Sequence, residues 1–228
     1  MTRSQLKAKL HTRAIGAEEK TERRAVILRA AEELLHADPG GGITVEDLAR
    51  RAGLAKGTVY LYFRTREEVL LQVHWERLQG LFDALEQELG APQPDVGYGA
   101  VRATLRYLRA HPEFLPLATN CRGMLEANTS AAAALEFKLA LGARLASIGA
   151  RIEAHYPGMA KGDGLAMLMN SYALMIGLWQ LTDPPACLRE AMLRPEMSMF
   201  RIDFEKQLAT ALLALWAGGA GSQGGRTP

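Results

Sequence analysis

The chain has 228 residues, with 27 Lys and Arg against 25 Asp and Glu, so it is long enough for one or two domains with an ample core and carries little net charge. The N-terminus lacks the apolar stretch of a signal peptide, and the two cysteines lack the spacing of a metal motif. These features exclude a disulfide-rich secreted scaffold and favour a protein of the reducing cytoplasm.

Residues 1–20 form a basic segment at the start of the chain. Arg3, Lys7, Lys9 and Arg13 all precede the first acidic residue. Such an arm can follow the phosphates of DNA or enter a minor groove. A solvated, disordered terminus accounts for the same composition, and the sequence alone leaves both interpretations open.

Residues 22–36 follow as a predicted helix whose apolar side chains face a small core. A run of Asp, Pro and three Gly at residues 38–42 ends this helix. The glycine run is not a phosphate loop, because no strand precedes it and no Gly-Lys-Ser/Thr sequence follows it.

Residues 44–66 contain two short helical patterns separated by Gly53. Thr44 can cap the first helix, with Asp47 completing a weaker form of the capping box. Gly53 permits the positive backbone angle of a tight turn. The second helix carries few apolar residues and presents a basic outer face rich in hydroxyl groups. This arrangement is typical of a helix-turn-helix and predicts DNA binding.

The outer face of the second helix supplies the main candidates for DNA contacts. Lys56 can donate to a guanine edge or to a phosphate, and Thr58 suits a phosphate or a thymine methyl group. Gly57 permits close approach of the backbone to the duplex. The hydroxyls of Tyr60 and Tyr62 suit phosphates, although the ring of Tyr60 can instead pack against the first helix.

The rest of the chain is predicted to be helical, since no alternating apolar pattern indicates a strand. A full capping box at residues 65–68 starts a long helix that ends at about Leu89. Residues 164–182 are uncharged and long enough to span a bilayer, but their polar side chains favour a buried helix of a soluble protein. Further helices are expected at residues 99–110, 113–128, 130–156, 162–182 and 197–217, with a short piece at 186–193.

Residues 20–72 carry a specific motif. Its elements are Arg24, Ile27, Leu28, Ala30, Ala31 and Leu35, then Thr44, Leu48, Ala49, Ala52 and Gly53, then Lys-Gly-Thr-Val-Tyr-Leu-Tyr-Phe at 56–63 and Arg-Glu-Glu-Val-Leu at 66–70. This motif resembles the TetR/AcrR family of bacterial transcriptional regulators. Ala55 stands where the family commonly has a capping Ser, and Arg66 replaces a common Lys while keeping a partner for a phosphate.

The resemblance implies an all-α fold, with an N-terminal three-helix helix-turn-helix DNA-binding domain and a larger C-terminal helical domain for effector binding and dimerisation. It adds Thr44, Val45, Glu46 and Arg66 to the candidate DNA contacts, although a plain solvated helix start explains Val45 and Glu46 equally well. The expected division is a basic arm at 1–20, the DNA-binding domain at 21–68, the ligand-binding and dimerisation domain at 69–217 and a disordered Gly-rich tail at 218–228.

The resemblance also implies a homodimer formed by the last two helices, 162–182 and 197–217. Both are apolar over more than one face, and such helices must be covered on more than one face. The apolar residues expected to do this are Leu165, Leu168, Met175 and Leu178 on the first helix, and Phe200, Phe204, Leu208, Leu212 and Leu215 on the second.

Met, aromatic and amide side chains of the later helices are predicted to line an effector pocket. Few charges lie in this region away from its helix ends, so we expect a mainly apolar small-molecule effector. Ordinary core packing explains the Met and aromatic residues too, and a buried amide can instead pair with another helix or with the dimer mate. The candidate pocket residues are Asn120, Met124, Phe137, Met167, Asn170, Met175 and Trp179, with Met169, Tyr172 and Gln180 nearby in the pattern.

The sequence offers no constellation for catalysis, a metal or a cofactor. The five histidines form no metal-binding pair, and no serine or cysteine nucleophile motif is present. The resemblance, together with this absence, implies a ligand-responsive repressor that binds a palindromic DNA operator as a homodimer, with no cofactor and no membrane partner. The alternatives are an effector-independent DNA-binding organiser or co-regulator, and a helical interaction protein or enzyme with a vestigial helix-turn-helix.

Overall fold

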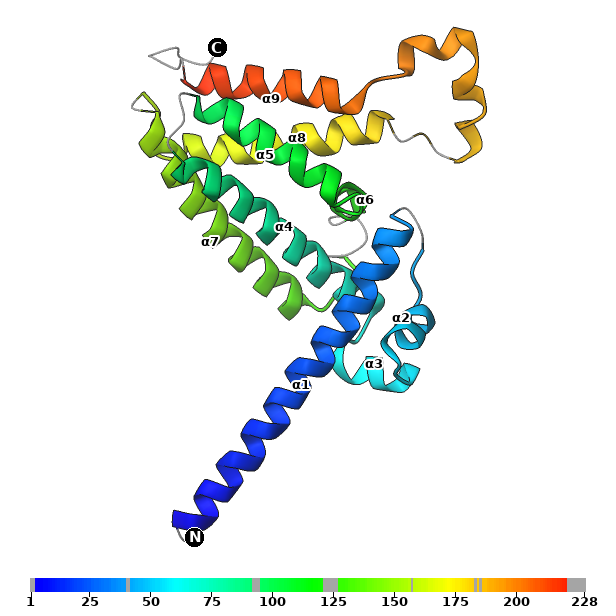
Figure 1. Ribbon diagram of the computed structural model, residues 1–228, viewed down its shortest axis with the longest axis vertical. Coiled ribbons are helices and arrows are strands. Elements are labelled where there is room, and N and C mark those ends of the chain that lie inside the picture. The colour runs from blue at the N-terminus through cyan, green and yellow to red at the C-terminus, as the bar shows by residue number, and fades with distance from the viewer. Residues whose placement is uncertain are drawn as a thin grey trace.

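The computed structural model describes residues 3–39, 42–91, 95–120, 127–156, 158–182, 184 and 186–220. Within these residues the chain forms nine α-helices and three short 3₁₀ helices, and no strand (Figure 1). The all-α expectation is therefore confirmed. A small N-terminal group of helices and a larger C-terminal bundle meet along the first long helix of the bundle.

The small domain consists of α1 (Arg3–Ala37), α2 (Val45–Ala52) and α3 (Lys56–Tyr62). The C-terminal part of α1 packs against α2 and α3, while its N-terminal part projects away from the rest of the chain (Figure 1). The core of this domain is apolar and fully enclosed, and includes Ile27, Ala31, Leu35, Leu48, Val59 and Phe63. On α1, the 3.6-residue helical period places Ile27, Ala31 and Leu35 on one face, which packs against the apolar residues of α2 and α3.

The first helix begins much earlier than residue 22, where the sequence suggested that it starts. It runs from Arg3 because residues 3–37 contain no Pro and only one Gly, and are rich in Ala, Leu, Lys, Arg and Glu, which favour helix. The basic segment expected as an arm is therefore helical from Arg3 onward.

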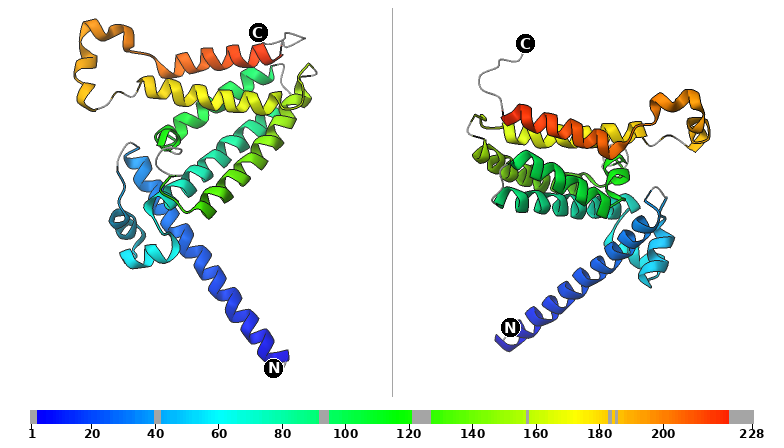
Figure 2. Two further views of the ribbon diagram at one scale, coloured as in Figure 1. Left: turned by 180° about the vertical axis from the view of Figure 1, so that it is seen from behind. Right: turned by 45° about the horizontal axis from the view of Figure 1, so that its top comes forward.

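The larger domain consists of α4 (Arg66–Gly90), α5 (Val96–Ala110), α6 (Phe114–Asn120), α7 (Ala131–His155), α8 (Asp163–Thr182) and α9 (Phe204–Ala220). α4 packs between α5 and α7, and α8 lies beside α9 to cover the other side of the bundle (Figure 2). Between α8 and α9 the chain projects as a segment with 3₁₀ turns, which are η2 (Ala186–Leu188), η3 (Ala191–Leu193) and η4 (Pro195–Phe200).

Three of the predicted boundaries in this domain are wrong. α5 begins at Val96 rather than residue 99, because the Asp95 carboxylate accepts from the Tyr98 N–H at 2.9 Å and caps it. The last helix begins at Phe204 rather than residue 197, because Asp203 caps it: the Asp203 carboxylate accepts from the Lys206 N–H at 3.1 Å. The helix then continues through two glycines to Ala220, into the expected tail, whose residues 221–228 lie outside the described ranges. The helix expected at 113–128 is described only as α6, because residues 121–126 also lie outside these ranges.

Among the described residues, α8 is the helix that is both long enough and apolar enough to cross a membrane. Its mean hydropathy reaches 1.2, and only 22% of the corresponding stretch is buried within the chain. It nevertheless packs against α6, α7 and α9 as a member of the bundle. The helix therefore has one side in the core and one uncovered, largely uncharged side.

α7 and α8 cross in direct backbone contact at two glycines. A methyl group on Gly149 would lie 2.7 Å from the backbone nitrogen of Leu165, and one on Gly164 would collide with the carbonyl oxygen of Gly149. Real side-chain carbons do not approach backbone so closely, so both positions require glycine for this crossing.

The substitution Gly164→Ala is expected to destabilise the protein by about 1–3 kcal/mol, because the two helices must separate to admit the methyl group. Gly142→Ala is the matched control: it lies on the exposed side of α7, where a methyl group would meet no atom of another described segment within 4 Å, and it should stabilise by up to about 1 kcal/mol through helix propensity. Thermal unfolding followed by circular dichroism measures both. Equal stabilisation by the two substitutions would contradict the crossing.

Candidate DNA interface and ligand cavity

The helix-turn-helix is held by local side-chain and backbone bonds. Thr44 caps α2: its hydroxyl oxygen accepts from the Asp47 N–H at 3.1 Å, and the Asp47 carboxylate accepts from the Thr44 N–H at 3.1 Å. Hydrogen bonds from Thr44 lower the pKa of Asp47. Gly53 ends α2 with a φ of 67° and a ψ of 32°, the left-handed conformation that glycine adopts without strain. The complete capping box and the glycine turn fix the angle at which α3 leaves α2.

α3 begins without a side-chain cap, since Ala55 has no side chain that can accept a hydrogen bond. Its position depends instead on Val59 and Phe63, which are buried against α1. The Arg24 guanidinium of α1 lies 4.3 Å from the centre of the Phe63 ring and donates to the Tyr62 carbonyl oxygen at 3.1 Å. α1 therefore anchors the C-terminal end of α3 and leaves its outer face free.

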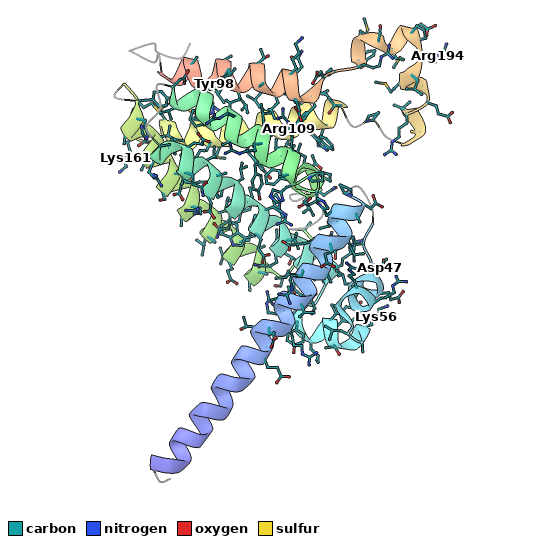
Figure 3. The ribbon with its side chains drawn as sticks, viewed as in Figure 1. Asp47, Lys56, Tyr98, Arg109, Lys161 and Arg194 are labelled. Carbon is teal, nitrogen blue, oxygen red and sulfur yellow. The ribbon has the colours of Figure 1, made fainter. Side chains whose placement is uncertain are left out.

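Five of the predicted DNA contacts are exposed, and four are half-buried. The exposed residues are Thr44, Glu46, Lys56, Gly57 and Tyr60, and the half-buried residues are Val45, Thr58, Tyr62 and Arg66. Figure 3 shows Lys56 and Asp47 on the outer side of α2 and α3. Leu61, which the sequence did not single out, is 78% exposed on the same short helix.

Two of the candidate contacts pair with each other in the free protein. The Lys56 ammonium donates to the Glu46 carboxylate at 2.6 Å, across the gap between α3 and α2. This hydrogen bond and charge raise the pKa of Lys56 and lower that of Glu46. Both groups are exposed, so a phosphate or a base edge can compete for the ammonium at little desolvation cost.

Arg66 is directed toward the protein. Its guanidinium donates to the Ile43 carbonyl oxygen at 3.3 Å and to the Glu67 carboxylate at 2.6 Å. These bonds tie the start of α4 to the segment before α2. The surface formed by α2 and α3 therefore supplies stronger DNA-contact candidates than Arg66 does.

The larger domain contains a partly open cavity of about 560 Å³ between α4, α7 and α8, and the exposed residues Met169, Ala173, Gly177 and Gln180 of α8 belong to its lining. Such a volume lies within the range of small-molecule sites, roughly 300–1,000 Å³. Most of its wall is aliphatic or aromatic. Those apolar residues are Leu78, Leu81, Phe82, Leu85, Ala118, Phe137, Leu141, Leu145, Leu168, Met169, Ala173, Met175, Ile176, Leu212 and Trp216.

The polar groups of the wall are few. Thr104 donates to the Ala100 carbonyl oxygen at 2.9 Å, and Ser171 accepts from the Trp216 indole at 3.2 Å. The hydroxyl of Tyr172 lies 3.3 Å from Nε2 of His74. Gln180 and Lys138 complete the polar part of the lining.

Of the predicted pocket residues, Phe137 and Met175 line this cavity, as do Met169, Tyr172 and Gln180. Asn120 does not: it is exposed, and its amide donates to the Pro116 carbonyl oxygen at 2.8 Å. Met124 lies outside the described residues.

Met167, Asn170 and Trp179 also lie outside the cavity wall, although they are on α8. Each residue of a helix is rotated by about 100° from the previous one, so α8 directs them to other surfaces. Met167 is buried close to Gly219 of α9, and Asn170 is exposed, contrary to the expected buried amide. The Trp179 ring meets Phe204 edge to face at 5.6 Å and lines a separate hollow of about 330 Å³.

His74 is the cavity residue that the sequence interpretation missed. It is fully buried on α4, and burial, together with the positive charge of Lys138, lowers its pKa to about 4. The available signal was its spacing, because residues 71, 74, 78, 81 and 85 fall on one face at intervals of three and four, and the others are apolar.

A buried ion cluster joins the small domain to the bundle. Glu113, just before α6, is fully buried and accepts from Arg77 of α4 at 2.5 Å. Arg77 also pairs with Glu32 of α1 at 3.0 Å, and His36 of α1 lies 3.6 Å from Glu113. The Tyr107 hydroxyl donates to the Arg77 carbonyl oxygen at 2.6 Å. This cluster fixes α1 against α4 at the junction of the domains.

Residues 27–73 match the family described as bacterial regulatory proteins, tetR family, and residues 76–222 match the tetracyclin repressor-like C-terminal domain. The HTH-type transcriptional regulator EthR of Mycobacterium tuberculosis is 46% identical over 50 residues, which are 22% of this chain and 23% of that protein.

EthR of Mycolicibacterium smegmatis is 31% identical over 110 residues, covering 41% of this chain and 51% of that protein. The fatty acid metabolism regulator protein of Bacillus subtilis is 30% identical over 63 residues, which are 28% of this chain and 32% of that protein. The chain therefore matches between about a quarter and about half of the length of these curated relatives.

Solved structures share the fold over most of the chain. A possible TetR family regulator from Streptomyces coelicolor A3(2) superposes with a TM-score of 0.56 at 21% identity, covering 86% of this chain and 97% of that one. The fatty acid degradation regulator FadR from Bacillus halodurans gives 0.54 at 17% identity, covering 85% and 94%. The C-terminal family match alone covers more than half of the chain, so this protein belongs to the TetR family of DNA-binding transcriptional regulators, which are not enzymes.

Proposed function

We propose that the protein is a cytoplasmic, ligand-responsive repressor that binds a palindromic operator as a homodimer and leaves it when a mainly apolar effector enters the cavity. The observation that carries this proposal is the placement of α4. The N-terminal half of α4 contacts the small domain, since Arg66 donates to the Ile43 carbonyl oxygen and Arg77 pairs with Glu32 of α1. The same helix supplies His74, Leu78 and Leu81 to the cavity wall. A ligand that moves α4 must therefore also act on the DNA-binding helices.

The surface of α2 and α3 supports the DNA contact. Lys56 and Tyr60 are exposed there, and Gly57 leaves the backbone uncovered, since a methyl group at this position would meet no described protein atom within 4 Å. The fold of the free protein therefore does not require glycine at residue 57. Close approach of the DNA backbone explains the residue.

The uncovered sides of α8 and α9 support the homodimer. The exposed residues of each helix recur at intervals of three and four and form one stripe, almost without charge. On α8 the stripe contains Ala166, Met169, Asn170, Ala173, Gly177, Gln180 and Leu181, and on α9 it contains Lys206, Gln207, Thr210, Leu213, Ala214, Ala217 and Gly218. Small residues allow the helices of two copies to approach closely, and an isologous four-helix interface would cover both stripes.

This interface differs in detail from the sequence expectation. Leu168, Met175, Leu208 and Leu212 were expected to face the partner, but all four are buried within one chain. They hold α8 and α9 to the bundle instead. The segment between these helices adds exposed apolar groups next to the stripes, and these are Leu188, Leu193, Met199 and Phe200.

The effector is proposed from the shape and chemistry of the cavity. A wall made mostly of aliphatic and aromatic groups favours an apolar ligand, and Met169 and Met175 can adapt to its outline. Two of the similar proteins are named as regulators of fatty acid metabolism or degradation, which supports an effector with an acyl chain.

The first test concerns DNA. Gly57→Ala is expected to stabilise α3 slightly, by up to about 1 kcal/mol, because alanine favours helix. It should nevertheless weaken operator binding about tenfold or more, because the methyl group occupies the space of the approaching duplex. Fluorescence anisotropy with an operator selected from random DNA measures the affinity. Unchanged operator affinity in the stabilised variant would show that Gly57 is not in contact with the DNA.

The second test concerns assembly. Wild-type protein is expected to sediment as a dimer at micromolar concentration, and Ala214→Arg should convert it to a folded monomer, because the charge would be buried between copies. Ala150→Arg on the exposed side of α7 is the matched control and should leave the dimer intact. A monomeric wild-type protein in analytical ultracentrifugation would refute the four-helix interface.

The third test concerns the cavity. Leu141→Trp should fill part of the lining and reduce the affinity for lipophilic ligands by about tenfold or more, without loss of operator binding. Leu139→Trp, at a 66% exposed position on the same helix, is the control. It should change neither the affinity for lipophilic ligands nor operator binding. Tryptophan fluorescence titrations measure ligand affinity, and release of operator DNA measures the response to the ligand. If no lipophilic compound releases the wild-type protein from DNA, the protein is an effector-independent organiser instead.

A further inference from the structure

His74 presents an unexplained polar group in the wall of the cavity. Its ring is fully buried, with the centres of the Phe114 and Phe137 rings at 5.8 Å and 6.4 Å. Nε2 lies 3.3 Å from the Tyr172 hydroxyl, whereas Nδ1 has no hydrogen-bond partner among the described residues. A buried nitrogen without a partner costs stability, so its retention needs a reason beyond folding.

The burial of the His74 imidazole favours its neutral form. Burial, with the charge of Lys138 as a smaller cause, lowers the pKa of His74 to about 4, well below neutral pH. A neutral imidazole carries one N–H donor and one acceptor nitrogen. When the Tyr172 hydroxyl donates to Nε2, the ring hydrogen resides on Nδ1. The ring then offers one N–H donor with no acceptor in the described protein.

The surroundings of His74 select against a charged partner. Lys138 is the one formally charged side chain among the lining residues of the described structure, and it lies on the exposed side of α7. A carboxylate placed next to a neutral imidazole among Leu78, Phe114 and Phe137 would lose its hydration, and the exposed Lys138 would compensate it only weakly because water screens its charge. A carbonyl oxygen loses far less on transfer and gains the missing hydrogen bond.

We infer that the effector is an elongated, uncharged lipophile with a single carbonyl group, such as an ester, a ketone or an amide, whose oxygen accepts a hydrogen bond from Nδ1–H of His74. Tyr172 acts as a positioning residue, because its hydroxyl holds the ring in the donating tautomer. The apolar part of the ligand lies against the leucines of α4 and α7. The inference rests on the proposed role of the cavity as the effector site.

The test compares three probes of equal chain length, methyl decanoate, decanoate and decane, with the full-length protein. Binding is measured by calorimetry, and release of the operator is measured by fluorescence anisotropy. The ester is expected to bind about tenfold more tightly than either other probe, which corresponds to one well-made hydrogen bond. Tighter binding of decanoate than of the ester would overturn the choice of an uncharged ligand.

Substitutions at His74 separate recognition from shape. His74→Phe should lower the affinity for the ester about tenfold and leave that for decane unchanged or higher. His74→Gln keeps an N–H donor and should retain a larger part of the ester affinity than His74→Phe does. Tyr172→Phe, which removes only the hydroxyl, should lower ester affinity severalfold and remains informative if His74→Phe does not fold.

The variant Leu141→Trp distinguishes the proposal that the cavity is the effector site from the inference that His74 recognises the ligand. Leu141→Trp should weaken the ester and decane alike, because it removes volume rather than a hydrogen bond. If Leu141→Trp weakens both probes while His74→Phe and Tyr172→Phe change neither, the cavity binds ligands but His74 does not recognise them. If none of the three probes binds the wild-type protein, the proposed effector site itself is wrong.

Discussion

The carboxylate of Glu113 is fully buried where the two domains meet, and Arg77 is the cation beside it. A buried charge of this kind is tolerated only with its partner, and breaking such a pair typically costs about 3–5 kcal/mol. The same guanidinium also forms an ion pair with Glu32 of α1, so it links the bundle to the small domain. The position of the DNA-binding domain relative to the bundle therefore depends on where α4 places the Arg77 guanidinium, together with that of Arg66, which donates to the Ile43 carbonyl oxygen.

The cavity lies along the same helix. His74 is one turn before Arg77 on α4, and Phe114 follows Glu113 directly while its ring contacts His74. A ligand that displaces His74 or Phe114 thus acts within one helical turn of the ion cluster. Packed interiors shift between discrete arrangements rather than deforming smoothly, so a small displacement here can become a rotation of α1 with α2 and α3.

The sequence predicted the DNA-binding half more accurately than the ligand-binding half, and the reason is physical. The capping of α2 by Thr44 and the turn at Gly53 involve residues within a few positions of each other, so local chemistry determines them. The extent of α1 was missed because a basic composition was taken as irregular although it favours helix. The pairing of Lys56 with Glu46 depends on the angle between two helices, which no local pattern specifies.

The cavity lining depends more strongly on tertiary packing than the helix-turn-helix does. α8 is apolar on several faces, so composition could not distinguish Met175, which lines the cavity, from Met167, which packs toward α9, or from Asn170, which is exposed. The same property left open whether α8 crosses a membrane, packs in a core or faces a partner. Its exposed, largely uncharged stripe is the surface that the proposed dimer would cover.

The most direct test of the proposed coupling between cavity and DNA surface is the distance between the two α3 helices of the proposed dimer. Spin labels at Leu61→Cys, which is 78% exposed, in a chain whose Cys121 and Cys187 are replaced, allow this distance to be measured by double electron–electron resonance. With operator DNA, the account predicts one narrow distribution near a helical turn of DNA, about 34–36 Å or a multiple of it, and a shifted distribution after ligand addition. A distance that is unchanged by a bound, DNA-releasing ligand would contradict the account.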